Sequence, residues 1–195
     1  MEQIKIQSLL NYLGETEESV EINIPTYSNG KYIEIDNMEY LVLTEDEAKE
    51  EFYNFQMSLI DDLGLDSFTD WAKDEILNHH TVTNYQVLFN DIMEEYAHAY
   101  IEDLKYMEKL EEEMELYGCK TEEEFVEWYC QEDSVKEFKN VFGDEEYKRI
   151  IIEHNLIDWD SVIEWLEQTD GRGCLAVYDG DELELDSGLY AYRTI

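Results

Sequence analysis

Proline and cysteine are scarce in this sequence of 195 residues, and their scarcity limits the architectures it can form. Pro25 is the only proline, and no Gly/Ser-rich stretch offers a flexible linker. The three cysteines, Cys119, Cys130 and Cys174, are odd in number and show no C-x-x-C spacing. This pattern indicates neither a disulfide framework nor a zinc site, and it is typical of reduced thiols. We therefore expect a single domain spanning residues 1–195.

Long apolar runs are also missing. No stretch approaches the roughly 20 apolar residues of a membrane helix. The first ten residues, MEQIKIQSLL, lack the basic region and apolar run of a signal peptide. An anionic lipid surface would repel a chain with this charge. The sequence thus predicts a cytoplasmic protein with no membrane partner.

Basic residues are few: Lys+Arg number 13 against 50 Asp+Glu, which gives a formal net charge of -37. The chain is nevertheless 44% hydrophobic and 13% aromatic, which is enough to build a core and is unlike a disordered acidic tail. So many like charges destabilise a compact state by repulsion, and solubility alone requires far fewer. The excess therefore indicates a function that depends on negative charge.

Alternating apolar and polar residues predict strands near both ends of the chain. Val20–Ile24, Tyr32–Ile35 and Glu39–Leu43 form the expected N-terminal group, within a β-rich region 1–43. Residues 4–13 fit either a strand or one helical turn. At the other end, 174–178 and 189–193 predict strands, with Leu183 and Leu185 as a candidate strand between them, in a β-hairpin or three-stranded meander within 170–195. We expect the strands of the two ends to share one sheet.

Residues 44–169 have the spacing of helices. Thr44 with Glu47, and Thr121 with Glu124, each form the sequence pattern of a capping box at a helix start. The longest expected helix runs from about Thr83 to Tyr117, ends at Gly118, and at 1.5 Å per residue would be about 50 Å long. The predicted class is α+β, with N-terminal antiparallel strands, a central helical region containing one long acidic helix, and a C-terminal hairpin.

Acidic residues occupy most polar positions of that long helix, and Lys105 and Lys109 are its only Lys or Arg residues. Duplex DNA carries one negative charge per about 1.7 Å of its axis, so a continuous helix bearing such a strip would resemble one face of a nucleic-acid backbone. This pattern predicts binding to a basic nucleic-acid-binding cleft of another protein, not to nucleic acid itself. The candidate partner-binding residues are Asp61, Asp62, Asp66, Asp91, Glu94, Glu95, Glu102, Asp103, Glu108, Glu111, Glu112, Glu113, Glu115, Glu122, Glu123 and Glu124.

Metal-binding and catalytic patterns are weak. Glu95-x-x-His98 matches the Glu-x-x-His element of di-iron bundles, but no second copy exists. The stretch 179–184, DGDELE, lacks a complete EF-hand loop. No P-loop, G-x-S-x-G or G-x-G-x-x-G occurs, so we expect no cofactor, no metal and no enzymatic activity. Arg172 is expected to be a buried or interface cation paired with nearby acids.

In overall character the sequence resembles the acidic anti-defence proteins of phages and mobile elements that imitate DNA: the anti-restriction Ocr and ArdA types, and the acidic anti-CRISPR proteins. The segments 170–173, 175–180 and 190–193 are also similar to the C-terminal ending of small acidic phage proteins. The resemblance implies a phage-encoded inhibitor, and the ArdA type implies a homodimer.

Two other hypotheses remain open at this point. The first is an acidic structural, assembly or protein-interaction protein that imitates no nucleic acid. The second is an enzyme that depends on a divalent metal.

Overall fold

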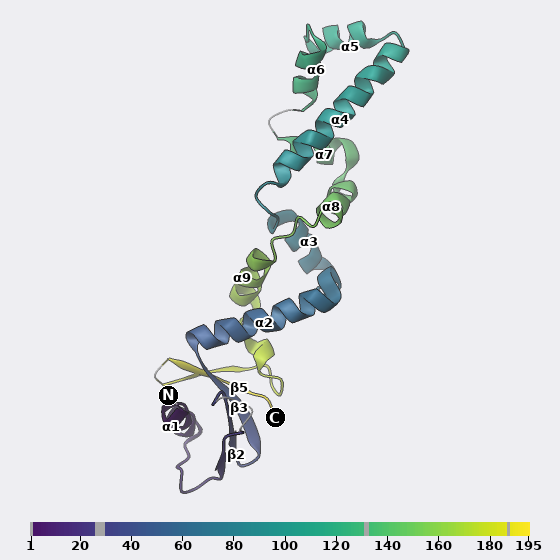
Figure 1. The fold of residues 1–195 in the computed structure, drawn as a ribbon. Coiled ribbons are helices and arrows are strands. Elements are labelled where there is room, and N and C mark those ends of the chain that lie inside the picture. Colours follow the sequence, from purple (N-terminus) through teal and green to yellow (C-terminus); the bar gives the residue numbers. More distant parts are fainter. Residues whose placement is uncertain (1, 26–29, 131–132, 187) are drawn as a thin grey trace. The chain divides into compact units, whose positions relative to one another are not determined.

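A computed structural model describes residues 2–25, 30–130, 133–186 and 188–195 (Figure 1). The chain divides into two compact units, one made of residues 1–69 and 160–195 and the other of residues 70–159. The class is α+β, as predicted, with an antiparallel sheet built from both ends of the chain. We call the two parts the sheet unit and the helical unit.

The sheet unit contains five strands in the order β1-β2-β3-β5-β4, all antiparallel. They are β1 Ile22–Asn23, β2 Tyr32–Ile35, β3 Met38–Thr44, β4 Glu182–Leu185 and β5 Leu189–Arg193. Strand β3 pairs with β5 from Tyr40 opposite Arg193 to Thr44 opposite Leu189. The expectation that strands from both ends share one sheet is therefore confirmed.

Helices make up the rest of the regular structure described in the sheet unit. They are α1 Glu2–Leu13, α2 Glu45–Leu63, η2 Gly64–Ser67, α9 Trp159–Asp170, whose first residue belongs to the helical unit, and η3 Gly173–Leu175. Leu9 and Leu10 of α1 join Ile33, Ile35 and residues of β3, β4 and β5 in one buried cluster. The first residues of the chain thus form a helix of three turns, where the sequence left a strand or a single turn open.

Helix α2 begins as its sequence predicts. The Thr44 hydroxyl accepts from the Glu47 amide at 3.3 Å, and the Glu47 carboxylate accepts from the Thr44 amide at 2.8 Å. The same Glu47 oxygen pairs at 2.8 Å with Lys5 of α1, whose side chain is only 3% exposed. The capping box is confirmed, and it also ties α1 to the start of α2.

The prediction of a strand at residues 174–178 is wrong. Gly173–Leu175 is a short 3-10 helix, and the strand that pairs with β5 lies further on, at Glu182–Leu185. The Gly173 backbone lies so close to Gly180 that an added Cβ would be 2.3 Å from the Gly180 carbonyl oxygen. This close approach folds the segment back on itself, which an extended strand would not allow.

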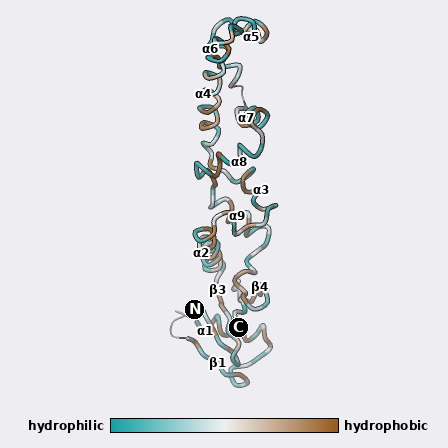
Figure 2. The backbone as a smooth tube through the Cα atoms, turned by 90° about the vertical axis from the view of Figure 1, so that its right-hand side faces the viewer, coloured by the Kyte–Doolittle hydropathy of each residue, from teal (hydrophilic) through white to brown (hydrophobic). Residues whose placement is uncertain are grey.

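The helical unit consists of α3 Asp70–His79, α4 Tyr85–Tyr106, α5 Leu110–Tyr117, α6 Glu122–Tyr129, α7 Ser134–Phe142 and α8 Asp144–Glu153. The segment after α3 meets the segment after α8 where Thr81 bridges Ile157 and the Val82 amide donates to the Leu156 carbonyl at 2.8 Å. Phe89 of α4 packs on Phe138 and Tyr147, with ring centroids 4.8 and 5.3 Å apart. Apolar and polar residues alternate around α4 in the hydropathy view (Figure 2).

The prediction of one continuous helix from 83 to 117 is wrong in one respect: the helix ends at Tyr106, and a second helix follows. Glu108 has a φ of 58°, in the left-handed region, and Leu110 then begins a separate helix. No proline or glycine causes the break. The turn allows Leu110 and Met114 to pack against Ile101 and Leu104 of α4, so tertiary packing outweighs helical continuity.

Candidate acidic interface

The acids singled out in the sequence lie at the surface. Of the sixteen, fifteen are exposed and Glu113 is partly buried. Asp61 and Asp62 at the end of α2, and Asp66 in η2, belong to the sheet unit. The other thirteen belong to the helical unit.

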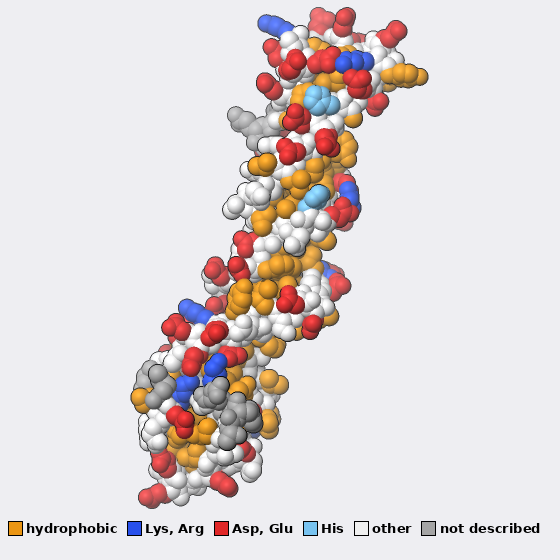
Figure 3. Space-filling model, viewed as in Figure 1, with side chains coloured by type: hydrophobic (Ala, Val, Ile, Leu, Met, Phe, Trp, Pro, Cys, Tyr) orange, Lys and Arg blue, Asp and Glu red, His pale blue; other side chains and the backbone are white. Residues whose placement is uncertain are grey.

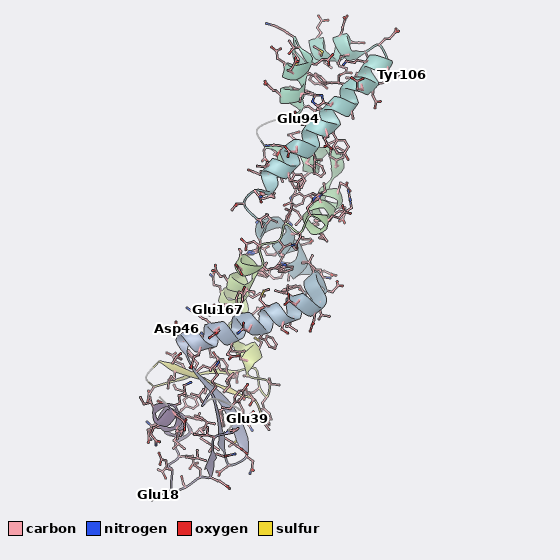
Figure 4. The ribbon with its side chains drawn as sticks, in the orientation of Figure 1. Glu18, Glu39, Asp46, Glu94, Tyr106 and Glu167 are labelled. Atoms are coloured by element: carbon pink, nitrogen blue, oxygen red, sulfur yellow. The ribbon has the colours of Figure 1, made fainter. Side chains whose placement is uncertain are left out.

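The middle of α4 carries its acids opposite its core. The buried residues of α4 are Phe89, Met93, Ala97, Ile101 and Leu104. At 100° per residue, Asp91, Glu95 and Glu102 fall on the face opposite this stripe. Glu94 lies beside that face, and its position is labelled in Figure 4. This part of the predicted strip therefore exists, over about 16 Å of helix.

The remaining acids surround a small hydrophobic cluster. Ile101, Leu104 and Phe125 are buried there, so the end of α4, α5 and α6 pack together. Acidic side chains gather over these helices in the space-filling view (Figure 3). We call this surface the acidic corner; its residues are Glu102, Asp103, Glu108, Glu111, Glu112, Glu113, Glu115, Glu122, Glu123 and Glu124. The structure thus replaces one linear strip by a strip on α4 and a folded corner beyond it.

Some corner acids also stabilise their own helices. Glu111–Glu113 and Glu122–Glu124 occupy the first turns of α5 and α6, where the helix dipole favours negative charge. The Thr121 hydroxyl accepts from the Glu124 amide at 3.2 Å, as predicted. The Glu124 carboxylate, however, accepts from the Lys120 amide at 2.6 Å, so the second half of the expected box lies one residue earlier. The Glu123 backbone amide and then the Thr121 hydroxyl lower the pKa of the Glu123 carboxyl, which keeps it charged.

Lys105 is the cation most closely involved with the corner. Its Nζ lies 3.0 Å from Glu102 and 2.8 Å from Glu122, so it joins α4 to α6. The hydrogen bonds that Lys105 donates to Glu122 and Glu102 raise the pKa of Lys105. Even with Lys109 and Lys120 counted, ten carboxylates against three lysines leave the corner strongly negative.

A groove between α4 and α8 contains one of the predicted acids, Glu95. Its volume is about 450 Å³. Helix α4 contributes residues at i, i+3, i+4 and i+7 spacing, and α8 does the same. The lining residues are Ile92, Glu95, Tyr96, Ala99, Glu146, Arg149, Ile150, Glu153 and His154. The α8 side of the groove was not predicted from the sequence. Its only sequence signal is the Glu146-x-x-Arg149-x-x-x-Glu153 spacing, which is that of i,i+3 and i,i+4 ion pairs.

Arg149 is already engaged within that groove. Its guanidinium pairs with Glu146 and Glu153 of the same helix, with Nε 2.8 Å from Glu146. These hydrogen bonds raise the pKa of Arg149, and Arg149 lowers the pKa of Glu146. Three carboxylates against one guanidinium leave the rim with two net negative charges, counting His154 as neutral.

A second concavity contains positively charged side chains. Lys136 and Lys139 of α7 line a cleft of about 670 Å³, together with Asp133 and Asp144. Lys139 donates to the Asn78 amide oxygen at 3.0 Å and lies 3.9 Å from the centre of the Tyr147 ring. Because both lysines are balanced by acids, the cleft shows no chemistry beyond polar contact.

No metal site emerges among the described residues, since no group of three or more His, Cys, Asp and Glu side chains there could hold an ion. His98 lies 3.8 Å from Glu94, and both are exposed. Within the same residues, no helix combines the length and the apolar character needed to cross a membrane.

Arg172 is a buried cation, as predicted. Its side chain is 8% exposed and lies within ion-pair distance of Glu45, Glu167 and Glu182. Burial alone would lower the pKa of its guanidinium, but hydrogen bonds to Glu182 and Glu45 outweigh burial and raise it. The network stabilises the sheet unit by joining Arg172 to the start of α2, to α9 and to β4.

Comparison with known proteins adds no relative: no protein-family model, no curated protein and no solved structure matches this chain.

Proposed function

We propose that this protein is a non-enzymatic inhibitor of a bacterial defence nuclease, either a CRISPR effector or a restriction enzyme. It would act in the bacterial cytoplasm by imitating a nucleic-acid backbone and occupying the nuclease's basic DNA- or RNA-binding groove. The observation that carries the proposal is the acidic corner, where ten carboxylates surround one small hydrophobic core. Such a surface needs no cofactor to act.

The mechanism that fits this surface is electrostatic. Clustered like charges steer a basic partner toward the corner and increase the association rate, which salt then reduces. Individual exposed pairs contribute about 0–1 kcal/mol, so each carboxylate changes affinity only a few-fold. The surface should therefore work collectively.

A charge-reversal experiment tests this mechanism. One variant changes Glu108, Glu111, Glu112 and Glu115 to Lys. A matched control also changes four exposed acids to Lys, so that the net charge changes equally. These acids belong to the sheet unit: Glu18, Glu50, Asp181 and Glu184. Binding to purified defence nucleases is measured by surface plasmon resonance over a salt series, with and without their DNA.

The corner variant should lose about 100-fold in affinity, mostly in association rate, and the control much less. Nucleic acid should compete with the wild-type protein for the same nuclease. Equal losses in both variants would remove the corner from the binding site. Simultaneous binding of protein and nucleic acid would overturn mimicry itself.

A protein-interaction role without mimicry is the second candidate. It is favoured by Tyr106, which is 91% exposed at the end of α4 (Figure 4). Tyrosines of this kind serve as anchors in protein interfaces. Under this alternative, Tyr106→Ser would weaken binding to a partner more than any single acid-to-amide change, and nucleic acid would not compete.

A further inference from the structure

The groove between α4 and α8 has a composition that neither the strip nor the corner shares. Three of its lining residues are apolar, Ile92, Ala99 and Ile150, and we call them the apolar floor; the Tyr96 ring also lines the groove. Tyr96 is 43% exposed even though its ring packs 4.5 Å from that of Phe142. A surface that only imitated phosphates would have no use for this apolar floor.

The spacing of the lining residues suits a helical occupant. On each helix the groove residues fall at i, i+3, i+4 and i+7, a pattern that presents one continuous face over two turns. Two such faces form a trough about 10 Å long, which matches about two turns of a third helix. An extended strand would find no sheet edge there.

The net charge of the groove rim determines which charge the occupying helix must carry. Glu95 on one side, with Glu146 and Glu153 on the other, exceed the single charge of Arg149. A second copy of this chain, with its own net charge of -37, would be repelled. A helix with an apolar stripe flanked by Lys or Arg would instead place its stripe on the floor and its cations against the rim.

We propose that the α4–α8 groove is a docking site for a cationic amphipathic helix of a partner protein. This proposal rests on the proposed function only for the partner's identity: a nucleic-acid-binding target would supply the cations. Binding at the groove adds contact that salt does not screen. The complex should therefore retain affinity at salt concentrations that abolish attraction at the acidic corner.

The test uses a defined probe and the full-length protein. The probe is a 16-residue peptide with leucines at i, i+3, i+4 and i+7 spacing and arginines flanking them. The reference is a scrambled peptide of the same composition, with equal charge but no apolar face. Calorimetry at 150 mM and 500 mM NaCl measures both affinities, and amide chemical shifts locate the contact.

Two variants place a large side chain on α4 without changing its charge. Ala99→Trp fills the groove, whereas the control Val87→Trp alters an exposed position of the same helix outside it. As a second pair, Glu153→Arg removes a rim acid and Glu145→Arg removes an exposed acid of α8 that does not line the groove. Thermal melts check that all four variants fold.

The amphipathic peptide should bind about tenfold more tightly than the scrambled one, and the preference should persist at 500 mM NaCl. Ala99→Trp and Glu153→Arg should remove this preference, and their controls should keep it. Equal binding of the two peptides, or an unchanged preference in Ala99→Trp, would overturn the proposal. Self-association that Ala99→Trp abolishes would also overturn it, because the occupant would then be a second copy. This test contains no nucleic acid. The groove proposal can therefore be overturned while the proposed competition with nucleic acid at the nuclease is upheld, and the competition can be overturned while the groove proposal is upheld.

Discussion

Arg172 and Glu45 are joined across 127 positions of the chain: the Arg172 Nη2 lies 3.1 Å from the Glu45 carboxylate. The same guanidinium contacts Glu182 of β4 at 2.8 and 3.2 Å, and Tyr192 of β5 donates its hydroxyl to Glu182 at 2.6 Å. The Tyr190 ring lies beneath it at 4.5 Å. In a protein with so few cations, this one connects the start of α2 to the C-terminal strands.

Removing Arg172 should therefore destabilise the sheet unit strongly. Arg172→Met leaves Glu45, Glu167 and Glu182 to repel one another, and loss of one member of a buried network costs about 2–4 kcal/mol here, since the acids are partly exposed. Arg149→Met is the matched control, because Arg149 is 51% exposed and its pairs are worth about 1 kcal/mol or less. Urea unfolding measures the free energy of unfolding of both variants and of the wild-type protein. Similar losses in the two variants would mean that the Arg172 network is no stronger than a surface pair.

The dependence of stability on pH should be two-sided. Hydrogen bonding to Arg172 lowers the pKa of Glu45 below its ordinary value of 4.5, and Arg149 does the same for Glu146. A lowered folded pKa means that each pair stabilises the fold above that ordinary value and ceases to do so as pH falls through the lowered one. As pH falls from 7 toward the ordinary carboxyl range, a growing fraction of the 50 acids is protonated, and this relieves repulsion before those pairs are lost.

We therefore expect the thermal midpoint to rise from pH 7 to about pH 5 and to fall below about pH 4. Circular dichroism melts in buffers of constant ionic strength test this. The Arg172→Met variant should show a smaller loss on the acid side, because its Glu45 has no guanidinium to lose. A thermal midpoint that falls steadily from pH 7 would show that repulsion among the carboxylates does not limit the stability of the fold at pH 7.

The sequence was most informative where local rules determine structure. The Thr44–Glu47 box starts α2, the Thr121 hydroxyl accepts from the Glu124 amide at the start of α6, and Gly118 ends α5 in a left-handed conformation. Alternation of apolar residues located β2, β3 and β5 within one or two residues. Each of these features depends on residues close together in the chain.

The break after Tyr106 depends on contacts that periodicity does not reveal. The apolar rhythm continues through Met107 and Leu110, so a continuous helix and a broken one have the same pattern. The structure buries Leu104 and Phe125 by turning α5 back toward α4. The α4–α8 groove is similar: Glu95 and Glu153 lie far apart in sequence, and only packing brings them to one trough.

Salt should stabilise the isolated protein. Moderate sodium chloride screens repulsion among the acids, with a Debye length of about 10 Å at 0.1 M. We expect the thermal midpoint to rise between 10 and 200 mM NaCl. Sodium sulfate at equal ionic strength separates screening from anion-specific effects. An unchanged or lower midpoint would show that the carboxylates are spaced or paired well enough to avoid repulsion.

The left-handed residue between α4 and α5 allows a direct test of the folded corner. A non-glycine residue at a φ near 58° costs about 1–2 kcal/mol, whereas glycine adopts this conformation freely at an entropic cost of about 0.5–1 kcal/mol. Glu108→Gly should therefore stabilise the protein by about 0.5–1 kcal/mol. Glu115→Gly is the control, because it removes the same charge from a helical position of α5, in its last turn, and should cost about 0.5–1 kcal/mol.

Urea unfolding of the two variants decides between the broken and the continuous helix. Opposite signs are expected, because only position 108 gains from glycine. A continuous helix from α4 through α5 would place both glycines in a helix interior, and both would then destabilise by similar amounts. In that case the acids after Tyr106 would lie on one straight strip, and the acidic corner would not exist.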